Sequence, residues 1–411
     1  MPVSPLTSAP ASGATMSPAL VVLLLGLLLG LQPLATDLYL PALPALQAGF
    51  SAPVAQVQLT LTALLLAFGC SQLLWGPLSD RWGRRPVLLT GVAGYVIGAL
   101  GCAAVDSMGA LIGWRALQGA ALGACVMCAR AVVRDLYGPV QGAQAMSRAL
   151  SGLGMIAFLA PVSGSLLVEL LGWRSTMVAQ ALLGAVVLLF AALRFQESLP
   201  QRNAQALQPL ALARNWARIV RHPTFQAYNL LTIFSYAGLF TNLAASSFTY
   251  IEVLGMERSH YGLMMGANAL FYIGGTVLCR RMLRRWSVQR CVAWAGLASA
   301  LAGLAMLASA LAGLQSVWAY ALPFMLFQLA HGVHMPCGQS NAISPFPQSA
   351  GTASAVNGFG MMLVAFAMGH WLGLHLDGST MALSAGVAFW GACTALTAWL
   401  LVRRFGQTSH L

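Results

Sequence analysis

Residues 76–86 read GPLSDRWGRRP, a short charged segment in a chain that is otherwise strongly apolar. Apolar stretches flank it at residues 54–78 and 86–105. A helix needs about 20 apolar residues to cross a bilayer, and each flanking stretch is long enough. The segment therefore predicts a tight link between two membrane-spanning helices. Its charged side chains are Asp80, Arg81, Arg84 and Arg85.

The composition of this link favours a mechanical role. Gly76 allows another helix to approach closely, and Gly83 allows a tight turn. Asp80 falls near the C-terminal end of the preceding helix, where the helix dipole disfavours an anion. It therefore needs an arginine partner or the N-terminus of another helix. We predict that the two glycines and the four charged residues form a conformational latch. The alternative is that the arginines only anchor the chain at the membrane surface.

The overall composition excludes a soluble protein. The chain has 411 residues, of which 58% are hydrophobic and 7% are charged. A soluble domain carries roughly 25% charged residues. This difference excludes an ordinary soluble enzyme, a disordered chain and a fibrous repeat. The apolar content is sufficient for on the order of 12 membrane-spanning helices.

The apolar stretches form two sets of six around one polar stretch at residues 196–222. The first set comprises residues 18–39, 54–78, 86–105, 110–132, 145–171 and 175–195. The second comprises residues 224–251, 261–283, 288–311, 316–342, 350–374 and 381–402. We therefore predict an all-α membrane protein with twelve transmembrane helices. They form two six-helix bundles, at residues 1–195 and 223–411, joined by a cytoplasmic linker at 196–222. Two equal halves are typical of secondary transporters.

The arginines predict the orientation in the membrane. All 21 basic residues are arginines, and the formal net charge is +12. With the N-terminus in the cytoplasm, every arginine falls on the cytoplasmic side except Arg115, Arg174 and Arg258. Because cytoplasmic loops collect basic residues, both termini are expected in the cytoplasm. The cytoplasmic loops then account for the excess positive charge, and no nucleic-acid partner is expected. Residues 1–17 lack the basic start of a signal peptide, so the first apolar stretch is expected to remain as a helix.

Several motifs resemble those of a known family. The segment at 76–86 resembles the signature loop of the major facilitator superfamily, G-x-x-x-D-R-x-G-R-R, with every position matched. Further matching segments are R-x-x-Q-G at Arg115, Gln118 and Gly119, RDLY at 134–137, APVSGS at 160–165, and ATDLYLPALP at 35–44. Together they resemble the Bcr/CflA subgroup of drug:proton antiporters. There are two departures from the subgroup pattern. Ser165 replaces the second of two paired glycines, and Ser247 replaces the proline of a Ser-Pro-Phe sequence.

Two intramembrane charges are the predicted proton-coupling residues. Asp37 and Arg115 lie at similar depths, and the resembled fold lines its cavity with the first, fourth, seventh and tenth spans. Charges inside a membrane usually have a partner or a function. We predict that Asp37 exchanges protons with the outside and that Arg115 is its partner. The alternative is that Asp37 caps the first helix or forms a static ion pair. In the resembled antiporter motif, Pro161 bends its helix and Gly164 provides a pivot.

Polar side chains within the spans predict a substrate cavity. His331, His334, Gly338 and Asn341 are spaced three, four and three residues apart, so they share one helix face. That face is expected to meet a water-filled cavity or another helix; hydrogen bonding between helices is the alternative for the histidines. The predicted cavity residues are Gln118, Tyr236, Asn242, Asn268, His331 and His334. Aromatic residues with a few polar groups suit a weakly polar ligand.

These features predict proton-coupled efflux of small amphipathic compounds, such as antibiotics, by alternating access. The alternative is proton-coupled import or export of a metabolite such as a nucleoside on the same fold. The sequence contains no HExxH motif, carboxylate-rich Mg²⁺ motif or filter loop, which argues against a membrane enzyme or a channel. The eight cysteines are scattered, and no metal or cofactor is expected. We expect a monomer in a bacterial inner membrane, with a small molecule, protons and the bilayer as its partners.

Overall fold

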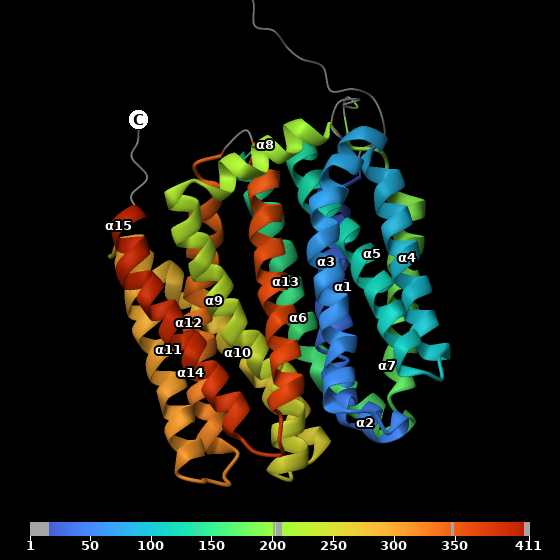
Figure 1. Cartoon of the computed structure of the whole chain (residues 1–411). Helices are drawn as coiled ribbons and strands as arrows, with labels where there is room; N and C mark the ends of the chain where they lie inside the picture. Colours follow the sequence, from blue (N-terminus) through green and yellow to red (C-terminus); the bar gives the residue numbers. More distant parts are fainter. Residues whose placement is uncertain (1–15, 138, 200–201, 203–207, 347–348, 407–411) are drawn as a thin grey trace, which may run out of the picture.

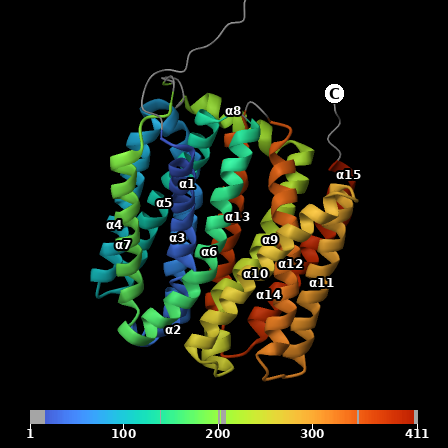
Figure 2. The same ribbon diagram turned by 180° about the vertical axis from the view of Figure 1, so that it is seen from behind.

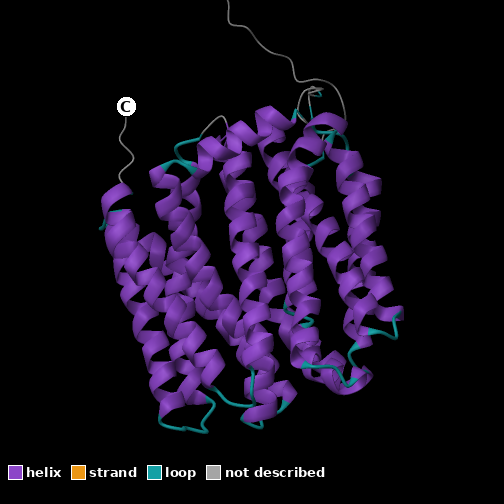
Figure 3. Cartoon of the chain, viewed as in Figure 1, coloured by secondary structure: helices purple, strands orange, loops and turns teal. Residues whose placement is uncertain are grey.

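The computed structural model describes residues 16–137, 139–199, 202, 208–346 and 349–406, and the described residues contain helices but no strand (Figure 3). The helices of the first half are α1 Pro18–Thr36, η1 Leu40–Ala42, α2 Leu43–Phe50, α3 Val54–Trp82, α4 Arg84–Ala104, α5 Met108–Leu136, α6 Pro139–Leu171 and α7 Arg174–Arg194. Those of the second half are α8 Pro209–Val220, α9 Pro223–Ser247, η2 Phe248–Val253, α10 Arg258–Leu283, α11 Val288–Leu311, α12 Trp318–Ile343, α13 Ala350–His375, α14 Met381–Leu396, η4 Thr397–Val402 and α15 Arg403–Phe405.

Local sequence signals start several of these helices. Ser17, Ser107 and Ser287 precede α1, α5 and α11, and each hydroxyl accepts a hydrogen bond from a backbone N–H three residues later. Such a cap satisfies one of the free donors at a helix start. Pro18 and Pro223 occupy the first positions of α1 and α9, where a missing N–H has no consequence.

Ten helical segments in the described part of the chain are long and apolar enough to cross a membrane. The 33-residue α6 and the 26-residue α12 lie side by side with these segments (Figures 1 and 2). Large apolar side chains on the outside of the molecule are exposed, for example Leu170 at 76% and Leu193 at 72%. Such a surface suits lipid rather than water. The chain is therefore a multi-pass membrane protein.

The helices of each half pack mainly with one another, and the halves meet along two seams. In one seam α3 lies along α13, and in the other α6 lies along α10 (Figures 1 and 2). Hydrogen bonds join the halves near the start of α3 and near the end of α5. Gln58 Nε2 donates to the Ala244 carbonyl at 2.6 Å, and Arg130 Nη1 donates to Ser354 Oγ at 2.9 Å.

The amphipathic helix α8 lies across the ends of the long helices, on the same side as α15 and opposite α2 (Figure 1). Asn215 on α8 donates to Thr352 Oγ1 on α13 at 3.4 Å. Residues 196–222, predicted only as a polar linker, therefore contain a helix that was not predicted.

The segment at 76–86 is not an extended link. Residues 76–82 continue α3 and Arg84 begins α4, so only Gly83 is not helical. At Gly83 φ is +107°, a conformation that favours glycine. The first span also differs from the prediction of residues 18–39, because α1 ends at Thr36 and η1 and α2 follow.

Candidate functional site

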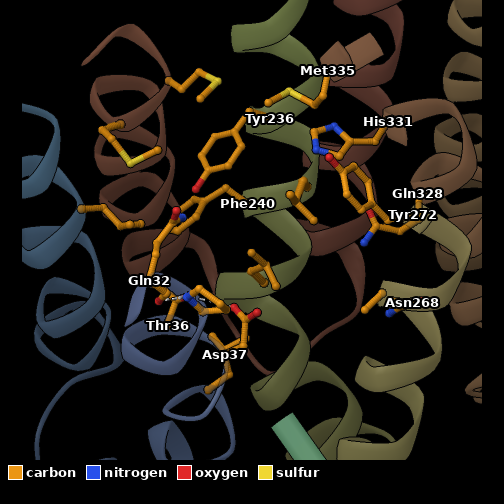
Figure 4. Close-up of a pocket in the computed structure, with 18 of the residues that line it drawn as sticks. Gln32, Thr36, Asp37, Tyr236, Phe240, Asn268, Tyr272, Gln328, His331 and Met335 are labelled. Atoms are coloured by element: carbon orange, nitrogen blue, oxygen red, sulfur yellow. Dashed lines mark hydrogen bonds between the residues drawn. The ribbon is translucent and has the colours of Figure 1, made fainter. Parts of the chain in front are cut away.

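A central cavity of about 330 Å³ lies between the two halves (Figure 4). Its walls are mainly aromatic, aliphatic and methionine side chains. The aromatic members are Phe68, Tyr236, Phe240, Tyr272 and Phe324. The polar members are Gln32, Thr36, Asp37, Gln72, Arg130, Asn268, Gln328, His331 and Gln339. This combination can enclose an apolar body and orient it through a few polar contacts.

Asp37 lines this cavity at the C-terminal end of α1. Its Oδ1 accepts a hydrogen bond from Thr36 Oγ1 at 2.8 Å. Among the described residues no arginine or histidine lies within ion-pair distance of it. Arg115 in particular is not in contact with it, so the predicted pair is not formed directly.

Arg115 instead holds the end of α1 in place. Tyr39 N–H bonds to the Thr36 carbonyl, so the Ala35 carbonyl does not receive the usual helical hydrogen bond. Arg115 Nη2 donates to that carbonyl at 2.7 Å. Its guanidinium also lies 4.3 Å from the centre of the Tyr39 ring. Arg115 is fully buried and thus fixes the segment that carries Asp37.

Further contacts of Arg115 tie α1, α3 and α7 to α5. Its Nη1 donates to Gln118 Oε1 at 2.8 Å and its Nε to the Thr60 carbonyl at 3.3 Å. Gln118 Nε2 in turn donates to Gln180 Oε1 at 2.9 Å. Gln118 is therefore part of a buried network between helices and does not line the central cavity, contrary to the prediction.

Of the other predicted cavity residues, Tyr236, Asn268 and His331 line the cavity, whereas Asn242 and His334 do not. Asn242 and His334 are fully buried within the second half. The Ser235 hydroxyl lies 2.8 Å from His331 Nδ1 and 3.2 Å from His334 Nδ1. One hydroxyl supplies a single proton, so one ring accepts from Ser235 while the other donates to it. His334 thus contacts His331 through the Ser235 hydroxyl and is not part of the cavity wall.

The latch residues surround the buried guanidinium of Arg84, which is 1% exposed. Arg84 Nη1 lies 2.6 Å from Asp80 Oδ1, and its Nε lies 2.8 Å from Asp135 Oδ2 on α5. The predicted need of Asp80 for an arginine is therefore met. Arg81 and Arg85 are exposed, and Arg85 Nη2 donates to the Ala192 carbonyl at 3.0 Å. The side chain of Arg134, in the RDLY segment, lies outside the described residues.

Glu197 completes this network, and the sequence analysis does not select it. Its Oε1 accepts from the Arg84 backbone N–H at 2.8 Å, and its Oε2 from that of Arg85 at 3.2 Å. A side chain at Gly83 would overlap this carboxylate. One signal is available in the sequence, because Glu197 is the only acidic residue in the arginine-rich stretch 196–222. At Gly76, by contrast, an added Cβ would make only ordinary contact, 3.5 Å from Met127 Cε.

The segment that resembles an antiporter motif lies where three helices meet. A Cβ at Gly164 on α6 would overlap the Leu38 carbonyl, just after Asp37. Ser165 packs against Gly262 on α10, so the departure to serine faces a glycine on the partner helix. Pro161 lines the central cavity. The predicted bend at Pro161 and Gly164 stays a prediction.

A second cavity of about 450 Å³ lies on the α8 side. It is lined by the latch residues Gly76, Asp80 and Arg84 and by Trp216 of α8. Gln72 and Arg130 line both cavities and so form the partition between them. Sequence reasoning places Arg130 only among the topology-determining arginines. Within the described residues, no group of three or more His, Cys, Asp or Glu side chains could hold a metal ion.

Two sets of membrane helices that meet around a mostly apolar cavity are typical of a multi-pass transporter. The family model of the Major Facilitator Superfamily matches residues 25–370. The chain belongs to the Major Facilitator Superfamily, which is a family of transporters rather than of enzymes.

Relatives within the superfamily carry drug-resistance names. The "Multidrug resistance protein D" of Escherichia coli is 30% identical over 341 residues, covering 82% of this chain and 84% of the relative. The "Bicyclomycin resistance protein homolog" of Haemophilus influenzae is 28% identical over 380 residues, covering 92% and 94%. The "Chloramphenicol resistance protein" of Pseudomonas aeruginosa is 30% identical over 343 residues, covering 82% and 80%. The resemblance to the Bcr/CflA subgroup is thereby confirmed.

The fold is shared with solved transporters. A D-xylose-proton symporter superposes with a TM-score of 0.74 at 15% identity, covering 92% of this chain and 97% of the other. At this level of identity the similarity concerns the fold alone.

Proposed function

We propose that this protein exports small amphipathic compounds, such as antibiotics, in exchange for protons by alternating access. The observation that carries the proposal is the central cavity, which has apolar and aromatic walls and, among the described residues, a single carboxylate at Asp37. The relatives named for resistance to bicyclomycin, chloramphenicol and several drugs support the same direction of transport.

In this proposal Asp37 takes up a proton from outside and releases it to the cytoplasm. Burial favours the neutral form of a carboxyl group, and access to water favours the ionised form. Opening of the cavity to alternate sides therefore changes which form is stable. Arg115 positions the end of α1 through the Ala35 carbonyl.

The remaining elements take mechanical roles. Arg84 with Asp80 and Asp135 stabilises one arrangement of α3, α4 and α5, with Gly76, Gly83, Arg81 and Arg85 in the same latch. Pro161 and Gly164 let α6 pivot against α1 and α10. The two halves, residues 1–195 and 223–411, rock against each other around the linker at 196–222.

The proposed topology has twelve spans with both termini in the cytoplasm of a bacterium, and the protein acts as a monomer in the inner membrane. α6 and α12, added to the ten apolar helical segments, give the twelve proposed spans. α12 is less apolar because Gln328 and His331 on it line the cavity. Arg84 lines the second cavity together with α8, and α8 and α15 lie on one side of the molecule (Figure 1). These segments are rich in arginine, which supports the cytoplasmic assignment.

The test is the cellular accumulation of a labelled compound panel, with and without an uncoupler, in a strain that lacks its own pumps. Export predicts that the uncoupler raises accumulation only in cells that express the protein. The Asp37→Asn variant should lose this response at equal expression, and proton-driven export that survives the substitution would remove Asp37 from the coupling step. If the uncoupler lowers accumulation, the protein imports its substrate and the metabolite alternative is favoured.

A further inference from the structure

The central cavity has one carboxylate and one guanidinium, and neither forms an ion pair among the described residues. The Asp37 carboxylate accepts from Thr36, and Arg130 donates to the Ser354 hydroxyl. Both side chains lie deep in the molecule, and their partial exposure is to the cavities that they line. Buried ionised groups are unfavourable unless they are paired. The two groups therefore point to a ligand that pairs with them.

These two charges lie at opposite ends of the cavity. Asp37 lies on the α2 side, at the depth of Arg115, which reaches the Ala35 carbonyl. Arg130 follows Arg115 on the same helix, and 15 residues at 1.5 Å each correspond to about 22 Å. Both side chains line the same cavity, and the ligand has to span the part of this interval that lies between them.

The walls between the charges suit an aromatic body. Figure 4 shows Tyr236, Phe240 and Tyr272 along the cavity, with Asp37 and Asn268 near one end. Asn268 Oδ1 and Gln328 Oε1 have no hydrogen-bond partner among the described residues. Both acceptors favour a ligand that donates hydrogen bonds, and Asn268 is the one near the Asp37 end (Figure 4).

We propose that the central cavity recognises amphipathic zwitterions, with a protonated amine at Asp37 and a carboxylate at Arg130. This inference rests on the proposed export function and adds the substrate class. Arg130 lines both cavities, so a compound that enters the central cavity from the α8 side reaches Arg130 before it reaches Asp37. The carboxylate replaces the Ser354 hydroxyl as acceptor, because a hydrogen bond between two charged groups is the stronger one.

The pairing of the ammonium group with Asp37 couples substrate binding to proton exchange. The ammonium group binds only the ionised carboxylate of Asp37, so the Asp37 proton passes to cytoplasmic water before the ammonium group pairs with it. On the outside, a proton taken up from water neutralises Asp37 and releases the ammonium group. Substrate and proton then compete for one carboxylate, as an exchanger requires.

The test measures binding to the purified full-length protein by equilibrium dialysis. The probes are ciprofloxacin (a zwitterion), its methyl ester (a cation) and its N-acetyl derivative (an anion). The wild type is expected to bind the zwitterion at least about 10-fold more tightly than either derivative. Arg130→Gln should weaken binding of ciprofloxacin and of the anion by about 10-fold to 100-fold and leave the cation unchanged. Arg130→Lys should restore part of the loss.

Three further variants separate recognition from structure. Asp37→Asn should weaken binding of the zwitterion and of the cation and leave binding of the anion unchanged. Arg290→Gln changes an exposed arginine at the start of α11, outside both cavities, and should affect none of the probes. Ser354→Ala removes the bond between the halves but keeps the guanidinium, so it should preserve the order of the three probes.

Equal loss of all three probes in Arg130→Gln, or the same loss in Ser354→Ala, would overturn the proposal and assign Arg130 to closure of the cavity. Failure of the protein to bind ciprofloxacin while it exports chloramphenicol in an uncoupler-sensitive manner would also overturn it, yet leave the export function intact. If no export responds to the uncoupler, the proposed function fails, and the binding order of the three probes still decides the charge recognition.

Discussion

Arg84 and Arg85 are neighbours in the signature segment, yet the structure predicts very different consequences of replacing them with glutamine. The Arg84 guanidinium is 1% exposed and contacts two carboxylates, at 2.6 Å for Asp80 and 2.8 Å for Asp135. Arg85 is exposed, and its side chain donates to one backbone carbonyl.

The magnitude follows from the burial of the carboxylates. Asp135 is 7% exposed, so Arg84→Gln breaks a largely buried ion pair, and the loss of one member of such a pair typically destabilises a protein by about 3–5 kcal/mol. Asp80 is 41% exposed and contributes little, because water screens it. Arg85→Gln should cost less than about 1 kcal/mol. At roughly 2 °C per kcal/mol for a chain of this size, the Arg84 variant melts about 6–10 °C lower.

The assay is thermal unfolding of the purified protein in detergent, with Arg85→Gln as the matched control. A double variant, Arg84→Gln with Asp135→Asn, should recover at least half of the loss, since it also removes the carboxylate that Arg84 contacts. Equal melting temperatures for the two single variants, or no recovery in the double variant, would refute the view that charge burial at Arg84 stabilises the latch.

Three more predictions follow from single positions. Arg115→Lys retains the charge, but one ammonium group cannot reach all the acceptors around Arg115. We therefore expect the free energy of unfolding to fall by about 1–3 kcal/mol and transport to be reduced. Unchanged transport would show that the Ala35 contact is dispensable. Gly164→Ala places a Cβ against the Leu38 carbonyl and should abolish transport or folded yield, whereas Gly109→Ala, in open space, should leave both unchanged. Gly83→Ala combines a φ of +107° with overlap on the Glu197 carboxylate, and should lower the melting temperature by several degrees; a melting temperature equal to that of the wild type would contradict this account of the turn.

The long helices were predictable because a bilayer requires continuous apolar segments with all backbone groups paired. α8 was not, because its 12 residues are too short to cross and its composition is mixed. Its apolar residues Leu212, Trp216, Ile219 and Val220 nevertheless follow a helical spacing. That pattern, read within the polar stretch, would have identified a short amphipathic helix.

The cavity was predictable only in part, because helix spacing places side chains on a face but does not show what that face meets. His331 and His334 are three residues apart, which corresponds to a rotation of about 300°. This offset is enough to direct His331 to the cavity and His334 into the second half beside Ser235. Likewise, the matched depths of Asp37 and Arg115 are correct, but Arg115 is directed to the helix end next to Asp37.

Among the described residues, the arginines Arg84, Arg115 and Arg130 differ in how the protein compensates their charge, and this difference separates their roles. Arg84 has two carboxylates and stabilises a structure. Arg115 has neutral acceptors and a tyrosine ring, which orient it without neutralising it, and it positions the end of α1. Arg130 has one serine hydroxyl and faces two cavities. A guanidinium with so little compensation is unfavourable in a resting protein, and it becomes favourable when a ligand brings the missing anion. The same reasoning applies to Asp37, whose charge a proton or an ammonium group compensates. In the proposed mechanism the two least compensated charges, Asp37 and Arg130, are therefore the ones that contact the substrate.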